Sequence, residues 1–164
     1  MKTLYLVRHA KSSWESARQS DFERTLNERG LKAAPLMANL LKKKQVLPQS
    51  VIASPANRAI TTAELFCEIL NFPEKEIKKR IEIYEGGSGQ LLQIVREIPD
   101  STKTAMLFGH NPTITEFSNL LTEEYIDSLA TCGVVRIDLK IESWKDALPG
   151  TGKLVWYDYP KKHL

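Results

Sequence analysis

The chain has 164 residues, a net charge of +3, and 42% hydrophobic and 26% charged residues. This length and composition suit one soluble globular domain, over residues 1–164, with room for a sizeable core. The basic residues are scattered along the sequence, so we expect a solvated surface and no nucleic-acid partner.

Membrane insertion and a cysteine-based metal site are not expected either. No stretch is apolar for long enough to span a bilayer, and no signal-peptide core follows Met1, so we expect a cytoplasmic protein with no membrane partner. Cys67 and Cys132 have neither metal-ligand spacing nor a disulfide framework, which fits a reducing compartment.

The first predicted element is a buried strand over the apolar residues 4–7. Arg8, His9 and a small residue follow it directly. In open α/β sheets the chemistry lies just beyond the carboxyl ends of the strands. His9 is therefore the first candidate for the reacting group.

A helix is the next regular element. Residues 11–24 are polar without a clear period and predict a loop. Apolar residues recur at helical spacing over residues 31–41, with Asn27 as the expected N-cap.

A second strand and helix repeat this pattern. Residues 51–53 predict a strand, and Ser54 and Pro55 are expected to cap and begin a helix that continues to Leu70. Arg58 then lies in the first turn, where a cation opposes the helix dipole. Its position makes sense if an anion binds there, although a surface arginine is an equal alternative.

The later segments predict a third and a fourth strand. Alternation over residues 77–84 predicts a strand, followed by a glycine-rich loop and a helix around residues 91–95. Residues 104–108 predict a buried strand, and residues 114–121 a helix. Between these two lies His110, a second imidazole directly after a strand.

Two strands near the C-terminus, over residues 134–141 and 154–159, are expected to form a hairpin at one edge of the sheet. The other strands alternate with helices, which predicts an α/β fold of three layers: a mostly parallel central sheet with helices on both faces. No repeat or linker divides the sequence into two domains.

Cations and imidazoles are expected to gather along one rim of this sheet. Arg8 and His9, Arg58, and His110 each follow a strand, and together they suit a dianion. The arginine fork matches phosphate oxygens, and a neutral imidazole can attack phosphorus. A second, protonated imidazole can donate to a phosphoryl oxygen.

Two other kinds of site are alternatives to an anion site. A metal site would need a third ligand, which no cluster of histidine and cysteine supplies. A general acid–base pair acting on a neutral substrate would explain the histidines but not the arginines.

Several motifs in order resemble the histidine phosphatase superfamily, also called phosphoglycerate mutase-like, and its small SixA-like phosphohistidine phosphatase branch. The motifs are RHAKSSW at residues 8–14, residues 21–30, SPANRA at 54–59, YE at 84–85, GHNP at 109–112 and TCG at 131–133. The resemblance covers nearly the whole chain and implies a phosphoglycerate mutase-like fold.

The resemblance also implies a mechanism without metal or cofactor. His9 would accept the phosphoryl group, giving a phosphohistidine intermediate that water hydrolyses. Arg8, Arg58 and His110 would hold the phosphoryl group and spread its charge, which agrees with what phosphoryl transfer asks of a protein.

Some positions depart from the family pattern. Larger relatives carry a carboxylic acid that protonates the leaving group, for which Glu85 is the first candidate here, Glu82 the second, and no carboxylate the third possibility. Glu15 stands near the place of an asparagine that the family uses to bind phosphate. Ser12 and Asn111 are candidate substrate-binding residues.

The leading functional expectation is a phosphatase acting on phosphohistidine or another phosphomonoester. The chain lacks the long insertions that shape pockets in mutases and acid phosphatases, so we expect an open site, which either takes a phosphorylated side chain of a phosphohistidine-carrying protein or is unselective. A small-molecule phosphatase or mutase, and a phosphate-binding module without turnover, are the alternatives. The sequence leaves the oligomeric state open.

Overall fold

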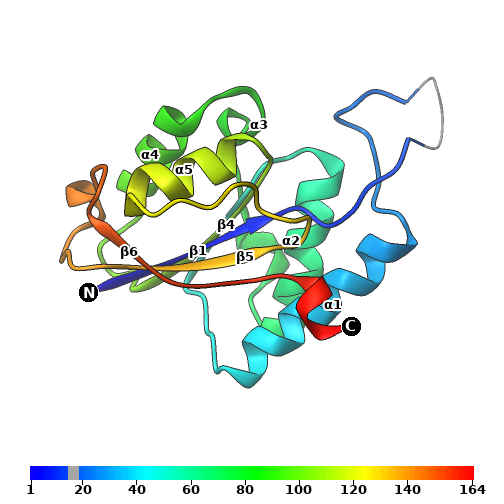
Figure 1. The fold of residues 1–164 in the computed structure, drawn as a ribbon, viewed down its shortest axis with the longest axis horizontal. Coiled ribbons are helices and arrows are strands. Elements are labelled where there is room, and N and C mark those ends of the chain that lie inside the picture. Colours follow the sequence, from blue (N-terminus) through cyan, green and yellow to red (C-terminus); the bar gives the residue numbers. More distant parts are fainter. Residues whose placement is uncertain (15–18) are drawn as a thin grey trace.

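The computed structural model describes residues 1–14 and 19–164, and within them it contains one six-stranded sheet with the strand order β3-β2-β4-β1-β5-β6 (Figure 1). Four strands, β1 to β4, run parallel, while β5 is antiparallel to β1 and to β6. The predicted mostly parallel sheet with a C-terminal hairpin at one edge is confirmed. The strands are β1 Lys2–Arg8, β2 Ser50–Ala53, β3 Lys78–Lys79, β4 Thr104–Gly109, β5 Val134–Leu139 and β6 Gly152–Asp158.

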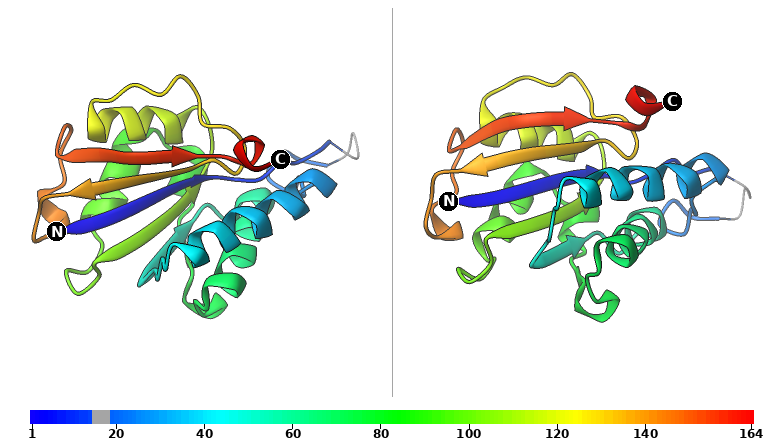
Figure 2. Two further views of the ribbon diagram at one scale, coloured as in Figure 1. Left: turned by 60° about the horizontal axis from the view of Figure 1, so that its bottom comes forward. Right: turned by 90° about the horizontal axis from the view of Figure 1, so that it is seen from below.

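Helices cover both faces of the sheet, as expected for three layers (Figure 2). One face carries α1 and α2, and the other carries α3, α4 and α5. The α-helices are α1 Glu28–Lys43, α2 Asn57–Leu70, α3 Glu82–Glu85, α4 Ser88–Arg96 and α5 Thr113–Thr122; single 3-10 turns are Glu74–Glu76, Trp144–Asp146 and Pro160–His163. No helix in the described part of the chain is both long and apolar enough to cross a bilayer.

The central strand β1 is buried on both of its faces. Tyr5 and Val7 pack in the core beneath α1 and α2, whereas Leu4 and Leu6 pack in the core beneath α4 and α5. Successive side chains of a strand point to opposite faces, so a short apolar run can serve both cores. This burial fixes the position of the residues that follow β1.

The base of the loop between β1 and α1 is tied to the start of α1. The side chain of Asn27 accepts a hydrogen bond from the amide of Gly30 at 2.9 Å, so the predicted N-cap is confirmed. The amide of Asn27 donates to the carbonyl of Lys11 at 3.0 Å. A Cβ atom on Gly30 would collide with that same carbonyl. The loop can therefore pack this closely against α1 only because residue 30 is a glycine.

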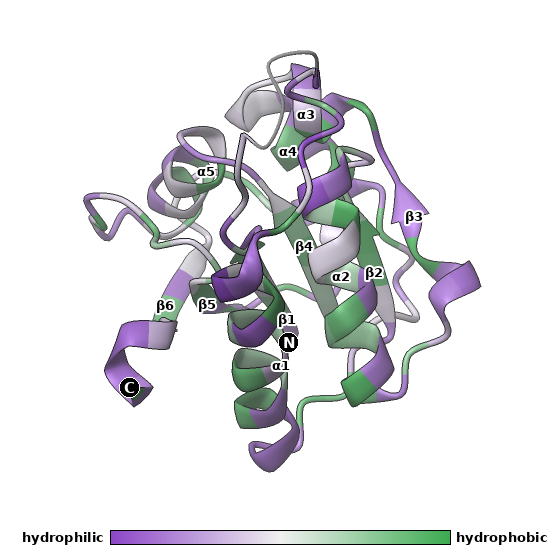
Figure 3. Ribbon diagram, turned by 90° about the vertical axis from the view of Figure 1, so that its right-hand side faces the viewer, coloured by the Kyte–Doolittle hydropathy of each residue, from purple (hydrophilic) through white to green (hydrophobic). Residues whose placement is uncertain are grey.

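The strand expected over residues 77–84 is wrong for most of its length. Only Lys78–Lys79 pairs with β2, and Glu82–Glu85 forms the helical turn α3. Figure 3 shows β3 in the hydrophilic colour at the edge of the molecule. The alternation was misleading because Ile77, just before β3, and Ile83, in α3, are both buried, whereas Ile81 between them is exposed.

Ser54 does not cap α2 as expected. The helix begins at Asn57, its N-cap position is Ala56, and no side chain caps it. The hydroxyl of Ser54 instead accepts a hydrogen bond from the amide of Ala56 at 3.2 Å and pairs with His110. The residue is therefore part of the rim where the strands end.

Candidate active site

The two strand-end histidines meet because β1 and β4 are neighbours. Arg8 lies level with Gly109 in the parallel register, and the amide of His9 donates to the carbonyl of Gly109 at 3.1 Å. The rings of His9 and His110 are 5.3 Å apart between centroids and inclined by 53°. The structure thus brings together the two imidazoles that the sequence placed on one rim.

His9 is a neutral imidazole whose Nε2 carries the free lone pair. Its Nδ1 lies 2.7 Å from the carbonyl oxygen of Ala10, and a carbonyl can only accept, so Nδ1 holds the proton. The side chain is 7% exposed. Burial, assisted by the nearby Arg58 and Arg8 guanidinium groups, lowers the pKa of His9 to about 4.

Arg58 lies against the lone pair of His9. Its Nε donates to Nε2 of His9 at the long distance of 3.4 Å, and the whole residue is only 5% exposed. The surface-arginine alternative is therefore wrong. A guanidinium group in this position can stabilise negative charge on any group that His9 Nε2 attacks.

Two buried nitrogen atoms of the rim have no hydrogen-bond partner within the residues that the structure describes: Arg8 Nε and His110 Nδ1. Elsewhere these side chains are anchored, because Arg8 Nη1 donates to the carbonyl of Leu129 at 2.8 Å and His110 Nε2 pairs with Ser54 Oγ at 2.8 Å. Leaving buried polar atoms unpaired costs free energy. The oxygens of a bound anion would satisfy both.

His110 is uncharged at neutral pH in the free site. Burial and the adjacent His9 and Arg58 lower the pKa of His110 to about 3. The protonated imidazole expected from the sequence therefore requires a bound anion, whose charge would favour the cationic form.

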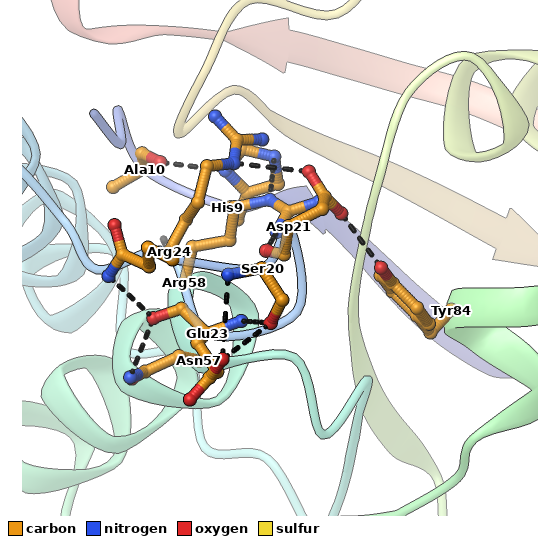
Figure 4. A network of polar contacts seen from close by, with 10 residues as sticks. His9, Ala10, Ser20, Asp21, Glu23, Arg24, Asn57, Arg58 and Tyr84 are labelled. Carbon is orange, nitrogen blue, oxygen red and sulfur yellow. Dashed lines mark hydrogen bonds and ion pairs between the residues drawn. The ribbon is translucent and has the colours of Figure 1, made fainter. Parts of the chain in front are cut away.

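A carboxylate that the sequence reasoning did not single out completes the cluster. Asp21 accepts hydrogen bonds at Oδ2 from Arg58 Nη2 at 3.0 Å and from the hydroxyl of Tyr84 at 2.8 Å (Figure 4). Its Oδ1 accepts from Arg24 Nε at 3.1 Å. Although partial burial acts to raise it, hydrogen bonds from Tyr84 and Arg58 hold the pKa of Asp21 below its usual value.

Residues 4–129 match the family model of the histidine phosphatase superfamily, branch 1. The chain belongs to this superfamily. It is 28% identical over 163 residues to an uncharacterised chloroplastic protein of Arabidopsis thaliana, covering 94% of this chain and 74% of that one. It is also 40% identical over 70 residues to a 2,3-bisphosphoglycerate-dependent phosphoglycerate mutase of Erythrobacter litoralis, covering 42% of this chain and 31% of the mutase.

Solved structures of SixA proteins share this superfamily fold over nearly the whole chain. The protein histidine phosphatase SixA in complex with tungstate superposes with a TM-score of 0.84 at 23% identity, covering 98% of each chain. A candidate phosphohistidine phosphatase SixA from Agrobacterium tumefaciens gives 0.83 at 25% identity, covering 97% of this chain and 98% of that one. The predicted phosphoglycerate mutase-like fold and the SixA-like resemblance are confirmed.

The two glutamates considered as proton donors do not join the cluster in the described contacts. Glu82 forms an ion pair with Arg80 at 2.8 Å, and the hydrogen bond from Arg80 lowers the pKa of Glu82 to about 2. The side chain of Glu85 is exposed and makes no hydrogen bond with another described residue. A role for Glu85 as the leaving-group acid stays a prediction without a supporting contact.

Two further candidates have structural contacts instead. Ser12 forms a backbone bridge with Leu26 and is half-buried. Asn111 donates to Leu129 O at 3.0 Å and to Ser128 Oγ at 2.8 Å, and it accepts from Thr115 Oγ1 at 2.6 Å. Direct substrate binding by either stays a prediction, and Glu15 lies outside the described residues.

The backbone near Cys132 supports the end of β1. The amide of Cys132 donates to the carbonyls of Arg8 and His9, both at 3.0 Å, from a backbone with φ of 59°. Both cysteines are buried thiols. Across residues 1–14 and 19–164, no three side chains of histidine, cysteine, aspartate or glutamate lie together as a metal site.

Proposed function

We propose that the protein is a phosphatase that hydrolyses phosphohistidine, or another phosphomonoester, through a covalent phosphohistidine on His9. One observation carries the proposal. The Nδ1 proton of His9 is bound by the Ala10 carbonyl at 2.7 Å, which leaves the Nε2 lone pair beside the guanidinium of Arg58. A neutral nucleophile next to fixed cations suits attack on a dianionic phosphoryl group.

In the first step, Nε2 of His9 attacks phosphorus as the bond to the leaving group breaks. The electron pair of that bond goes to the leaving atom. Arg58 and Arg8 donate to the phosphoryl oxygens, and the bound anion favours protonation of His110, whose unpaired nitrogen then donates as well. In this step, positioning and charge stabilisation come from these three side chains.

In the second step, water attacks the phosphoryl group on His9. The new oxygen–phosphorus bond forms while the Nε2–phosphorus bond breaks, and Nε2 regains its lone pair. The Ala10 carbonyl stabilises the positive charge on the phosphorylated ring through the Nδ1 proton. His9 then returns to its starting tautomer, and phosphate leaves.

A protein-borne phosphohistidine is the substrate that we favour. An open hollow of about 540 Å³ lies beside Arg8, lined in part by α5 and by Asp127 and Ser128. Its open shape suits a side chain presented by another polypeptide better than a small molecule that must be enclosed. The names of the SixA relatives support the same substrate class.

The test is a hydrolysis panel of a phosphohistidine protein, sugar phosphates and an aryl phosphate, with His9→Ala as the matched inactive variant. We expect turnover by the wild type, highest on the phosphohistidine protein, and none by His9→Ala. Hydrolysis that persists in His9→Ala would overturn the covalent mechanism. Phosphate binding without hydrolysis of any substrate would establish the non-catalytic binding module, and transfer between sugar positions would establish a mutase.

A further inference from the structure

Five side chains from separate parts of the chain form a closed ring of contacts that includes the candidate nucleophile, His9. Arg58 contacts His9 at 3.4 Å and Asp21 at 3.0 Å, and Tyr84 donates to Asp21 at 2.8 Å. The ring of Tyr84 lies edge-on to His110 with centroids 5.6 Å apart, and His110 lies 5.3 Å from His9. A carboxylate is therefore built into a site whose cations and imidazoles suit a dianion.

The carboxylate of Asp21 does more than hold Arg58. The main-chain carbonyl of Asp21 already accepts from Arg58 Nη1 at 2.7 Å, so Arg58 stays tied to this position without the side chain. A carboxylate offers about four acceptor sites, and Arg58, Tyr84 and Arg24 occupy three of them. The Asp21 side chain is 41% exposed, so a bound molecule can reach the remaining acceptor site.

A fixed negative charge beside a phosphoryl site determines which leaving groups the site accepts. It repels the phosphoryl dianion, and the loss is offset only if the leaving group donates a hydrogen bond or carries positive charge. A nitrogen leaving group, such as the protonated imidazole ring of phosphohistidine before it departs, carries an N–H, whereas the oxygen of an aryl or alkyl ester carries none. Ion pairs with Arg58 and Arg24 keep Asp21 ionised, so it has no proton to give to a departing alkoxide.

We propose that Asp21 is a specificity-determining residue whose carboxylate accepts a hydrogen bond from the N–H of a nitrogen leaving group, so that the site prefers phosphoramidates to phosphate esters. This inference rests on the proposed function. For phosphohistidine, Asp21 stabilises the imidazolium form of the substrate. When the phosphorus–nitrogen bond breaks, its electron pair returns to the ring, which departs as neutral imidazole with its own proton.

The test compares Asp21→Asn with the wild type on a phosphohistidine peptide and on an aryl phosphate. The amide is nearly isosteric and can still accept from Arg58, but it has no charge. We expect the ratio of kcat/KM for the phosphohistidine peptide to kcat/KM for the aryl phosphate to fall about tenfold, the effect of one charge-assisted hydrogen bond. Binding of inorganic phosphate, measured by calorimetry, should become tighter because the repelling charge is gone.

Glu23→Gln is the matched control. Glu23 is a carboxylate of the same loop that accepts from the Ser20 hydroxyl at 2.7 Å and makes no hydrogen bond to the ring of five residues. Its substitution should leave the ratio unchanged. If the ratio is unchanged in Asp21→Asn, whether both activities stay the same or fall equally, the role of Asp21 is overturned and the phosphatase proposal still stands. A wild type that hydrolyses neither substrate would instead overturn the proposed function itself.

Discussion

The imidazoles of His9 and His110 lie 5.3 Å apart because each follows one of two adjacent parallel strands. Neither ring is free to turn, since His9 is fixed by the Ala10 carbonyl and His110 by Ser54 Oγ. Chain segments a hundred residues apart thus deliver two nitrogens to one place with fixed orientation. Such preorganisation matters most for phosphoryl transfer, where the protein supplies position and charge.

Ser54→Ala should lower activity by releasing the ring of His110. The substitution removes the 2.8 Å contact to His110 and the acceptor for the amide of Ala56, in a residue that is 0% exposed. We expect kcat/KM for an aryl phosphate to fall about tenfold and the free energy of unfolding to fall by about 1–2 kcal/mol. Steady-state kinetics and urea denaturation measure the two effects.

The control for that variant is Ser118→Ala. Ser118 is also fully buried, but its hydroxyl has no partner within the described residues. Removing it should leave kcat/KM unchanged and cost less stability than Ser54→Ala. Equal activity in the two variants would contradict an orienting role for Ser54.

The stability of the fold should decline in mild acid because of His9. Burial lowers its pKa from 6.5 to about 4. Between these pH values the unfolded chain binds a proton at this position and the folded protein does not, so the free energy of unfolding decreases as the pH falls. His9→Asn should therefore lose less stability between pH 7 and pH 4.5 than the wild type does. Parallel urea curves at the two pH values test this, and an equal loss in both proteins would refute it.

The regular elements next to the core could be predicted because their patterns are local. The apolar run of β1 and the helical spacing of α1 each reflect burial within one segment. The segment around Ile83 could not be predicted in the same way, because α3 is a single turn of four residues and is too short to show a helical repeat. A short alternating pattern does not distinguish such a turn from a strand.

The residues of the candidate site also include some that the sequence could predict and some that it could not. Arg8, His9 and His110 were predictable because each lies at the end of a strand or directly after it, and the sheet itself brings strand ends together. Asp21 was not, because its position in an aperiodic loop says nothing of its partners. It meets Arg58 and Tyr84, which are 37 and 63 positions away in the sequence.

Gly30→Ala should destabilise the protein by forcing the loop away from α1. The new Cβ would collide with the backbone carbonyl of Lys11, which cannot move aside as a flexible side chain could. We expect the free energy of unfolding to fall by about 1–3 kcal/mol. Gly89→Ala is the matched control, because Gly89 lies in α4 with nothing within 4 Å of its added Cβ. That variant should be neutral or slightly stabilised, and a similar loss in both would contradict the steric explanation.

Asn111→Ala should weaken phosphate binding through Arg8 rather than through direct contact. Asn111 donates to Leu129 O, the same carbonyl that accepts from Arg8 Nη1. Without the amide, the carbonyl is less firmly placed, and the guanidinium loses orientation. We expect KM for an aryl phosphate to rise several-fold, on the order of 1 kcal/mol of binding free energy, with kcat less affected.

Asn119→Ala separates this effect from a general loss of stability. Asn119 lies on α5, just beyond Asn111 in the chain, and it too ties this region to the following segment, through two hydrogen bonds with the backbone of Ile126 at 2.9 and 3.0 Å. It does not touch the carbonyl that holds Arg8. Both variants should lower the melting temperature, but only Asn111→Ala should raise KM. A rise in KM of the same size in both would mean that Asn111 acts through the stability of α5 and not through the orientation of Arg8.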